Sequence, residues 1–304
     1  MPEIRIGTAS WTERTLVESG LFYPKDVATA EARLKFYAEH FDTVEVDSTY
    51  YSPPAERNAV LWAERTPPGF LFNIKAYSML TKHPTLIKSI PKVLRGSLPH
   101  KYAEQPKSTD FPKEIVESAF DMFHSALSPL KDATKLGCVL FQFPPWFLPS
   151  PEGYKWLELV REKFPSTCVA VEFRNRKWLV TSERKKAADF LKANGMSSVA
   201  VDAPWINNWE GPLDLTTDIA YMRFHGRNRE SWFKKGIPTE EKYRYAYTQK
   251  ELKAWAGRIK AVSEPANIVF VIFNNCYQDY AVTNAGMMKG LLVVPQADSP
   301  RRTG

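Results

Sequence analysis

Short runs of β-branched and aromatic residues alternate with longer amphipathic stretches along the whole chain. Eight of the short runs are predicted to be strands, because turn-forming residues flank them and apolar positions recur with a period of two. They are residues 4–8, 43–47, 70–75, 137–143, 168–174, 198–202, 219–225 and 268–275. Helical periodicity lies between them, at residues 30–40, 55–65, 153–163, 183–193, 250–262 and 279–292. This alternation predicts a parallel sheet.

The number of repeats favours a closed barrel over an open sheet. Eight strand–helix units within 304 residues fit the size of a (β/α)8 barrel of the TIM type. No glycine-rich dinucleotide fingerprint or phosphate-binding loop follows a predicted strand. We therefore predict an α/β protein with a single barrel domain over residues 1–295 and a disordered tail over residues 296–304.

Two segments interrupt the alternation. Residues 77–111, rich in lysine and proline, form a long insertion after the third predicted strand and are too long for a simple connector. Residues 203–215, which include Trp205 and Trp209, form a second irregular loop after the sixth strand. Both segments follow strands and therefore belong to the carboxyl face of the barrel, where the insertion is expected to act as a lid or binding loop.

The alternation within each strand separates an apolar face from a polar one. In the second strand Glu45 and Asp47 lie opposite the valines, and in the sixth strand Asp202 does so. We take the apolar face to pack under the helices, so that the polar residues late in each strand converge at one mouth. They are Glu45, Asp47, Asn73, Lys75, Gln142, Glu172, Arg174, Asp202, Arg223, His225 and either Asn274 or Asn275. An internal salt-bridge network that only fills the barrel is the alternative, but convergence from so many strands favours a functional pocket.

Composition adds an uneven charge to this picture. The formal net charge is +7, and residues 81–107 hold six cations against Glu104, which gives this stretch +5. Such a segment favours anionic partners, phosphate or nucleic acid, although a solvated loop is the simpler alternative. The N-terminus carries no signal-peptide pattern, and no apolar run is long enough to cross a bilayer. Cys138, Cys168 and Cys276 are too few and too scattered for a disulfide framework or a thiolate metal site. We therefore expect a cytoplasmic protein with no membrane partner and leave its oligomeric state open.

Ordered sequence segments over nearly the whole chain then resemble one family. They are GTASW at 7–11, FYP at 22–24, VEVDSTYY at 44–51, PPGF at 67–70, LFQFPP at 140–145, VEFR at 171–174, RFHGR at 223–227, FNN at 273–275 and AVTNA at 281–285. On these segments the chain resembles the DUF72 (YecE-like) family, whose fold is a TIM-type barrel and whose activity is not established. The resemblance implies the barrel and the pocket but no reaction. The chain departs from the family pattern at Cys276, where an acidic residue is usual, at Ala9 and Ser10, and in the long insertion.

The residue types in the predicted pocket suggest roles. Proton transfer or nucleophilic attack is assigned to the candidate catalytic residues Glu45, Asp47, Lys75, Glu172, Asp202 and His225. Substrate binding is assigned to Trp11, Asn73, Gln142, Arg174, Arg223, Arg227, Asn274 and Asn275. Aromatic residues near the mouth, among them Tyr50, Tyr51, Trp146, Trp205 and Trp209, offer stacking planes.

Two kinds of chemistry are weighed against simple acid–base catalysis. Of the five histidines only His225 falls at a strand end, so a zinc site is not expected, and no metal-binding residues are assigned. The carboxylates could hold Mg²⁺ or Mn²⁺, but neighbouring cations compete for them and a required metal is not favoured. Lys75 could form a Schiff base, yet an ion pair with Glu45 or Glu172 is the favoured expectation.

The sequence thus predicts an enzyme that acts on a phosphate-bearing substrate (a phosphodiester, nucleotide or sugar phosphate) by acid–base chemistry, hydrolytic or eliminating. Two alternatives remain. One is a nucleic-acid-binding module that uses the basic insertion, and the other is a lyase or aldolase that uses Lys75.

Overall fold

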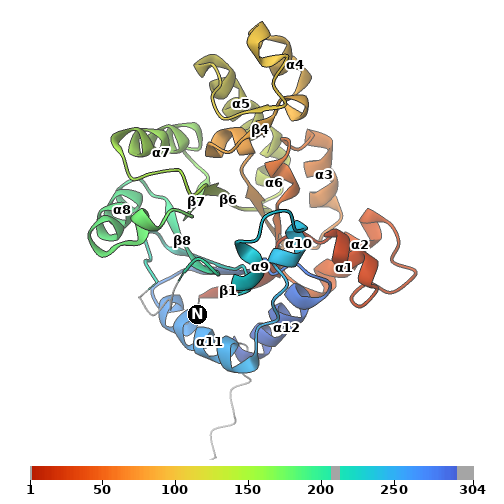
Figure 1. Cartoon of the computed structure of the whole chain (residues 1–304). Helices are drawn as coiled ribbons and strands as arrows, with labels where there is room; N and C mark the ends of the chain where they lie inside the picture. Colours follow the sequence, from red (N-terminus) through yellow and green to blue (C-terminus); the bar gives the residue numbers. More distant parts are fainter. Residues whose placement is uncertain (1, 207–212, 293–304) are drawn as a thin grey trace, which may run out of the picture.

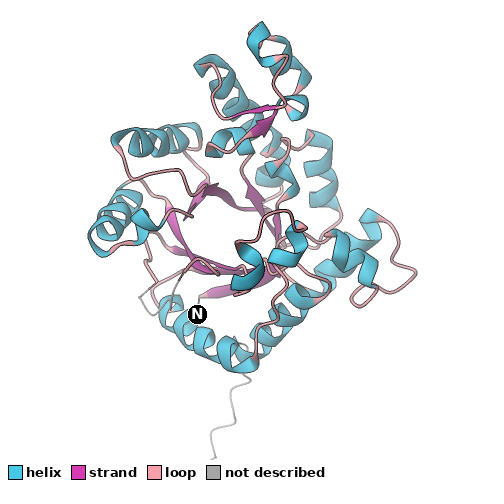
Figure 2. Cartoon of the chain, in the orientation of Figure 1, coloured by secondary structure: helices cyan, strands magenta, loops and turns pink. Residues whose placement is uncertain are grey.

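The eight predicted strands form the wall of a barrel. The computed structural model describes residues 2–206 and 213–292. Its barrel strands are β1 (Glu3–Thr8), β2 (Thr43–Val46), β3 (Leu71–Lys75), β6 (Leu136–Phe143), β7 (Cys168–Phe173), β8 (Ser197–Asp202), β9 (Ile219–Phe224) and β10 (Ile268–Phe273). They pair in parallel in the order β1-β10-β9-β8-β7-β6-β3-β2. Figure 2 shows them as a ring with the helices outside, which confirms the (β/α)8 prediction.

The ring closes between β1 and β2 through a single parallel bridge, Ala9 with Glu45. Elsewhere between β1 and β2, a side chain replaces the backbone hydrogen bonds of the ladder. The Tyr37 hydroxyl accepts from the Thr8 amide at 2.8 Å and donates to the Thr43 carbonyl at 3.2 Å. A Cβ atom on Gly7 would lie 2.0 Å from the Thr43 carbonyl oxygen. Glycine at this position therefore lets the first and second strands approach closely enough to close the barrel.

Most helices cover the outer face of the ring, and the short helices that follow β9 lie in front of it, as Figure 1 shows. They are α1 (Arg14–Ser19), α2 (Ala30–His40), α3 (Glu56–Glu64), α4 (Lys92–Gly96), α5 (Lys113–Ala126), α6 (Ser128–Asp132), α7 (Pro151–Lys163), α8 (Thr181–Ala193), α9 (Arg229–Trp232), α10 (Thr239–Lys242), α11 (Gln249–Ser263) and α12 (Tyr280–Leu292). The predicted helices coincide with α2, α3, α7, α8, α11 and α12 to within two residues at either end. The sequence ranges omitted α5, whose apolar face packs Phe120 and Phe123 into the core.

Apolar residues fill two layers, one on each side of the strands. The outer layer lies between strands and helices and includes Val44, Phe72 and Phe224. The inner layer fills the barrel and includes Leu140, Ala170, Val199, Val201, Tyr221 and Ile272. No helix in the described part of the chain has both the length and the hydropathy needed to cross a bilayer.

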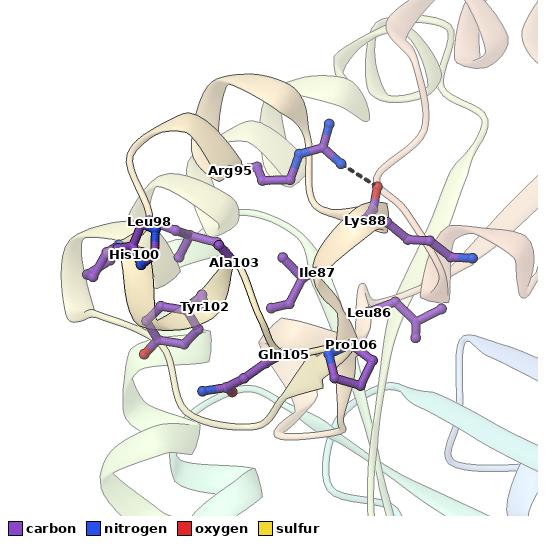
Figure 3. Close-up of a pocket in the computed structure, with 11 residues that line it drawn as sticks. Leu86, Ile87, Lys88, Arg95, Leu98, His100, Tyr102, Ala103, Gln105 and Pro106 are labelled. Carbon is purple, nitrogen blue, oxygen red and sulfur yellow. Dashed lines mark hydrogen bonds between the residues drawn. The ribbon is translucent and has the colours of Figure 1, made fainter.

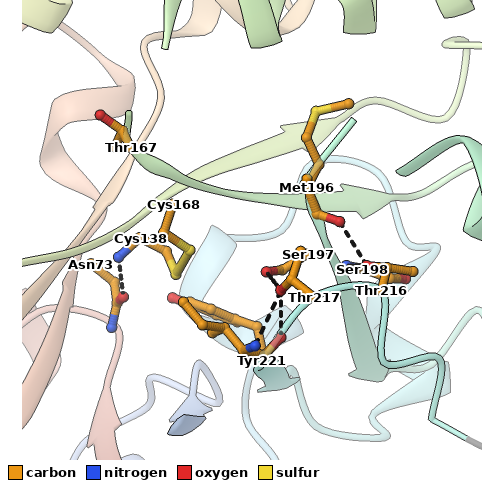
Figure 4. Close-up of a disulfide and its surroundings, with 12 residues drawn as sticks. Asn73, Cys138, Thr167, Cys168, Met196, Ser197, Ser198, Thr216, Thr217 and Tyr221 are labelled. Atoms are coloured by element: carbon orange, nitrogen blue, oxygen red, sulfur yellow. Dashed lines mark hydrogen bonds between the residues drawn. A yellow bond between two sulfur atoms is a disulfide. The ribbon is translucent and has the colours of Figure 1, made fainter. Parts of the chain in front are cut away.

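A disulfide joins two neighbouring strands in the barrel interior (Figure 4), which the sequence, with cysteines judged too few and too scattered for a disulfide framework, did not predict. Cys138 on β6 and Cys168 on β7 are direct register partners with Cα atoms 4.6 Å apart. Their sequence separation of 30 residues concealed this, because parallel strands joined by a crossover helix become adjacent only in the folded barrel. Disulfides are uncommon in reducing compartments, and the cytoplasmic location stays a prediction.

The insertion after β3 lies beside the barrel rather than across its opening, contrary to the prediction of a lid. It holds a two-stranded antiparallel sheet, β4 (Thr85–Leu86) with β5 (Lys107–Ser108), and the short helix α4. In Figure 1 the orange and yellow elements β4 and α4 stand outside the ring of strands. Four 3₁₀ segments, at Ser48–Tyr50, Ser78–Thr81, Ile87–Ser89 and His100–Tyr102, lie in or near this region, and a fifth at Arg176–Leu179 follows β7.

Candidate functional site

A buried arginine lies at the centre of the barrel's carboxyl end. Arg223, late on β9, points inward and is fully buried. It donates to Glu45 through Nε at 2.9 Å and Nη2 at 2.6 Å, and to Glu172 through Nη1 at 2.5 Å. Tyr221 donates to the same Glu45 carboxylate at 2.9 Å. Both carboxylates are thus hydrogen-bonded, as burial requires, and they share the single positive charge of Arg223.

The network continues to a second arginine nearer the opening. Gln142, inward on β6, accepts from Arg223 at 3.0 Å and from Arg174 Nη2 at 2.9 Å. Arg174 Nε also lies 3.4 Å from a Glu172 oxygen. Its side chain retains 18% of its exposure, and its guanidinium lies 5.1 Å from the centre of the Trp205 ring. Among residues 2–206 and 213–292 its Nη1 has no hydrogen-bond partner, so it is a donor for a bound anion.

His225 joins this network in its neutral form. Its Nε2 lies 3.3 Å from Glu172, and its Nδ1 lies 2.8 Å from the Asn274 amide nitrogen. An amide nitrogen donates, so Nδ1 accepts and the ring proton is on Nε2, facing Glu172. Burial lowers the pKa of His225 to about 3, although Glu172 opposes the change. Burial works the other way on Glu172, but Arg223 and His225 outweigh it and hold the pKa of that carboxyl well below its usual value.

Lys75 and Asp47 lie at the ends of β3 and β2 and are not part of the ion-pair network. Among residues 2–206 and 213–292, the Lys75 ammonium forms no hydrogen bond or ion pair, and it lies 4.8 Å from the centre of the Tyr50 ring. The expected ion pair of Lys75 with Glu45 or Glu172 is therefore wrong, because Arg223 occupies both carboxylates. Burial, and then Arg223, lower the pKa of Lys75 to about 8. Burial raises the pKa of Asp47, while Lys75 opposes that change.

The loop after β9 covers the mouth, a role that the sequence prediction gave to the insertion. Trp232, at the end of α9, lies 4.8 Å from Trp205, ring centre to ring centre. Tyr243, just after α10, contacts Trp232 at 5.2 Å and lies 6.3 Å from His225. Figure 1 shows α9 and α10 in front of the ring of strands. Trp232 and Tyr243 were missed because neither belongs to a periodic segment.

The insertion contributes one residue to the mouth at its first turn. His83 is buried and lies 5.2 Å from the Tyr50 ring and 5.9 Å from the Trp146 ring. Burial, reinforced by Arg174 and Lys75, lowers its pKa to about 3. Tyr51 and Trp146 expose more than half of their surface. Trp209 lies outside the described residues.

Asp202 does not point into the barrel, so this prediction is wrong. On β8 the inner residues are Val199 and Val201, and Asp202 faces the helix layer beside Phe224. There it accepts from Trp255 Nε1 of α11 at 2.6 Å and from the Tyr247 hydroxyl at 3.0 Å. Its other side-chain contacts are with Arg227, a predicted substrate-binding residue.

Three further predicted binding residues have structural partners outside the mouth. Arg227 pairs with Asp202 and with Glu251 on α11, so its guanidinium fixes the loop after β9 against that helix. Asn275 faces outward and donates to the Tyr245 carbonyl and to Asn284 on α12, at 2.8 and 2.9 Å. Trp11 packs in the outer layer, 5.9 Å from Trp62 and 6.3 Å from Phe72.

Asn73 points inward but is committed to the barrel wall. Its amide donates to Thr43 Oγ1 at 3.0 Å and its carbonyl accepts from the Cys138 amide at 2.8 Å. The hydrogen bond from the Cys138 amide, drawn in Figure 4, satisfies that amide where the β3–β6 register shifts. Asn73 therefore holds two strands together rather than facing a ligand.

The donor set does not fit a resident metal ion. Within the residues that the structure describes, no group of three or more His, Cys, Asp or Glu side chains could hold an ion. Glu45 and Glu172 already bind Arg223, which a cation would have to displace. Cys276, which the sequence did not assign to the site, donates to the Ala9 carbonyl at 3.1 Å, and burial raises its thiol pKa well above the usual value.

The fold and the site together define a class: a (β/α)8-barrel protein with a buried, mixed-charge network at the carboxyl ends of its strands. The chain belongs to the DUF72 family, described as "Protein of unknown function DUF72", whose sequence model matches residues 5–303. It is 32% identical to the UPF0759 protein YunF of Bacillus subtilis (strain 168), over 95% of this chain and 94% of that protein.

Solved structures of two DUF72 family proteins resemble it along almost their full lengths. The one from Thermotoga maritima MSB8 is 31% identical, with a TM-score of 0.74 over 95% of this chain and 99% of that one. The one from Enterococcus faecalis V583 is 26% identical, with a TM-score of 0.76 over 97% of each chain. These relatives support the resemblance inferred from the sequence segments and name no activity.

Proposed function

We propose that this protein is an enzyme that acts on a small phosphate-bearing substrate at the carboxyl end of the barrel, with Lys75 and Asp47 as its proton-transfer groups. One observation carries the proposal: Lys75 presents a largely buried amine that has no ion-pair partner among the described residues, beside a carboxyl group of raised pKa. Charged side chains in such a position are unfavourable for folding unless paired. Strongly perturbed pKa values that converge in one cavity mark candidate catalytic groups.

The two groups are suited to complementary steps. With a pKa of about 8, about one Lys75 amine in ten is neutral at pH 7 and able to take a proton. The raised pKa of Asp47 favours its acid form, which can give one. In an elimination, Lys75 would take the proton from carbon, the carbon–oxygen bond would break, and the phosphate would leave with the proton of Asp47.

Substrate binding is assigned to Arg174. Its guanidinium lies at the edge of the network, and its Nη1 has no partner in the part of the chain that the structure describes. It lies beside the Trp205 and Trp232 rings, 5.1 and 6.0 Å from their centres. A guanidinium with aromatic neighbours is a good anion ligand, because the rings shield the ion pair from water. Glu45, Glu172, Arg223 and His225, predicted as catalytic or binding residues, would instead act as the rigid base that positions Arg174 and Lys75.

The test uses a panel of sugar phosphates, nucleotides and phosphodiesters, with thermal shift for binding and product formation for turnover. We expect Lys75→Met and Asp47→Asn to keep binding and lose turnover by at least about 100-fold. Arg174→Gln should weaken binding by about tenfold or more. The exposed Lys101→Gln variant is the matched control. Unchanged turnover in both Lys75→Met and Asp47→Asn would refute the proposal. Binding of single-stranded DNA that needs only residues 85–107 would favour the nucleic-acid module instead.

A Schiff base on Lys75 is the second candidate, favoured by the same missing ion pair. The neutral amine would attack a substrate carbonyl, and loss of water from the carbinolamine would give an iminium. Borohydride reduction in the presence of carbonyl-bearing sugar phosphates should add the ligand mass to the wild type and not to Lys75→Met. Turnover that depends on Lys75 without such trapping would assign the lysine to proton transfer alone.

A further inference from the structure

The insertion contains a pocket of its own. It has a volume of about 620 Å³ and lies between β4, the end of α4 and the segment that leads to β5. That volume falls within the range of about 300–1,000 Å³ typical of small-molecule sites. None of the residues that line it belongs to the barrel mouth. We call it the insertion pocket.

The walls of the insertion pocket are largely apolar. Figure 3 shows Ile87, Leu98, Tyr102 and Ala103 around the hollow, with Leu86 at its edge. Ile87 and Tyr102 are buried, whereas Leu86 leaves 42% of its surface exposed. Exposed apolar surface around a concave pocket is typical of a binding site, since folding alone would favour covering it.

The charged residues that line the pocket are cationic. They are Lys88 and Arg95, and no acidic side chain is among the lining residues. Arg95 donates through Nη1 to the Lys88 carbonyl at 2.8 Å, drawn in Figure 3, which orients the guanidinium. Its other donors have no partner in the described part of the chain, so they are available to an anion.

We propose that the insertion pocket binds a small amphipathic anion, with an apolar body against Ile87, Leu98 and Tyr102 and a carboxylate or phosphate head at Arg95. The proposal is independent of the barrel site. Charge complementarity decides for this occupant: the six cations and one acid of residues 81–107 repel a cationic amphiphile, and the apolar walls offer nothing to a purely hydrophilic anion. Of these cations, Lys88 and Arg95 line the pocket.

The test is calorimetric titration of the full chain with decanoate, decyl phosphate and 1-decanol, each below its aggregation threshold. We expect saturable one-to-one binding of at least one anion, about tenfold tighter than the alcohol. The comparison of the two anions identifies the preferred head group. Arg95→Gln should weaken anion binding to the level of the alcohol and leave decanol unchanged.

Two further variants locate the site. Lys92→Gln removes an equal charge from the same helix without touching the pocket, and it should leave the affinity within about twofold. Ala103→Trp, at an exposed lining position, should fill the cavity and abolish binding of all three probes with the fold intact by thermal unfolding. Equal losses in Arg95→Gln and Lys92→Gln, equal affinities for decanol and both anions, or the absence of binding would overturn the proposal. So would loss of binding in Arg174→Gln, which would assign the ligand to the barrel.

Discussion

Replacing Lys75 with methionine is expected to stabilise the protein, although it removes a proposed functional group. A pKa of about 8 in the folded state, against an ordinary 10.5, makes the charged amine unfavourable by about 3 kcal/mol below pH 8. Methionine loses the contact with the Tyr50 ring, which is worth about 1 kcal/mol. The net gain at pH 7 is therefore about 2 kcal/mol, which equilibrium urea unfolding can measure.

The stabilisation by Lys75→Met should depend on pH, in the direction set by the lowered pKa of Lys75. The folded pKa is lowered, so the unfolded chain binds more protons between pH 8 and 10.5, and wild-type stability recovers as the pH rises through that window. The advantage of Lys75→Met should shrink to under about 1 kcal/mol at pH 9.5. A stabilisation that stays constant from pH 7 to 9.5, or a destabilised variant at pH 7, would refute the reasoning.

Lys135 provides the matched control within the chain. Its ammonium is also buried, but it donates to the Ala63 and Thr66 carbonyls at 2.6 Å each. Lys135→Met should therefore destabilise the protein by about 1–3 kcal/mol, because two carbonyls lose their donor. Opposite signs for the same substitution at Lys75 and Lys135 would isolate the missing partner as the cause.

Three other predictions concern stability. Glu45→Gln weakens a buried ion pair with the central arginine and should lower the free energy of unfolding by about 3 kcal/mol; an unchanged urea midpoint would contradict the network. The pKa of His225 in the folded protein is about 3, so the free energy of unfolding should fall by about 2 kcal/mol through this residue as the pH drops from 6.5 to 4.5. His225→Gln should remove this part of the pH dependence, whereas the variant His100→Gln, at an exposed histidine, should not. Reducing the Cys138–Cys168 disulfide should destabilise the protein by about 3–4 kcal/mol. Thiol titration of the unfolded chain should count one thiol before reduction and three after it, and a count of three thiols before reduction would exclude the disulfide.

The strands and most helices followed from the sequence because periodicity is a local property. Regular alternation over 43–47 or 219–225 reports a strand whatever lies around it. The site residues that alternate with large outward-facing apolar side chains were also placed correctly on the inner face, as for Glu45 and Arg223. The residues of α9 and α10 carry no such period, and their place over the mouth could not be read locally.

On β8, tertiary structure rather than the alternation decided which face points into the barrel. On β8, Val199 and Val201 fill the barrel while Asp202 lies under α11, the reverse of the prediction. A barrel strand is buried on both sides, so hydrophobic alternation distinguishes the two faces without saying which is inside. The pairing of Cys138 with Cys168 could not be predicted locally either, because the two strands become neighbours only in the folded barrel.

The sequence by itself therefore determined the fold class, the family and the collection of charged residues at one end of the barrel. Tertiary structure alone decided how those charges are partitioned. Arg223 takes both Glu45 and Glu172, Asp202 is bound in the helix layer, and Lys75 is left without an ion-pair partner among the described residues. The physical reason is distance: hydrogen bonds and ion pairs act over a few ångströms, and those separations exist only once the ring of strands has closed.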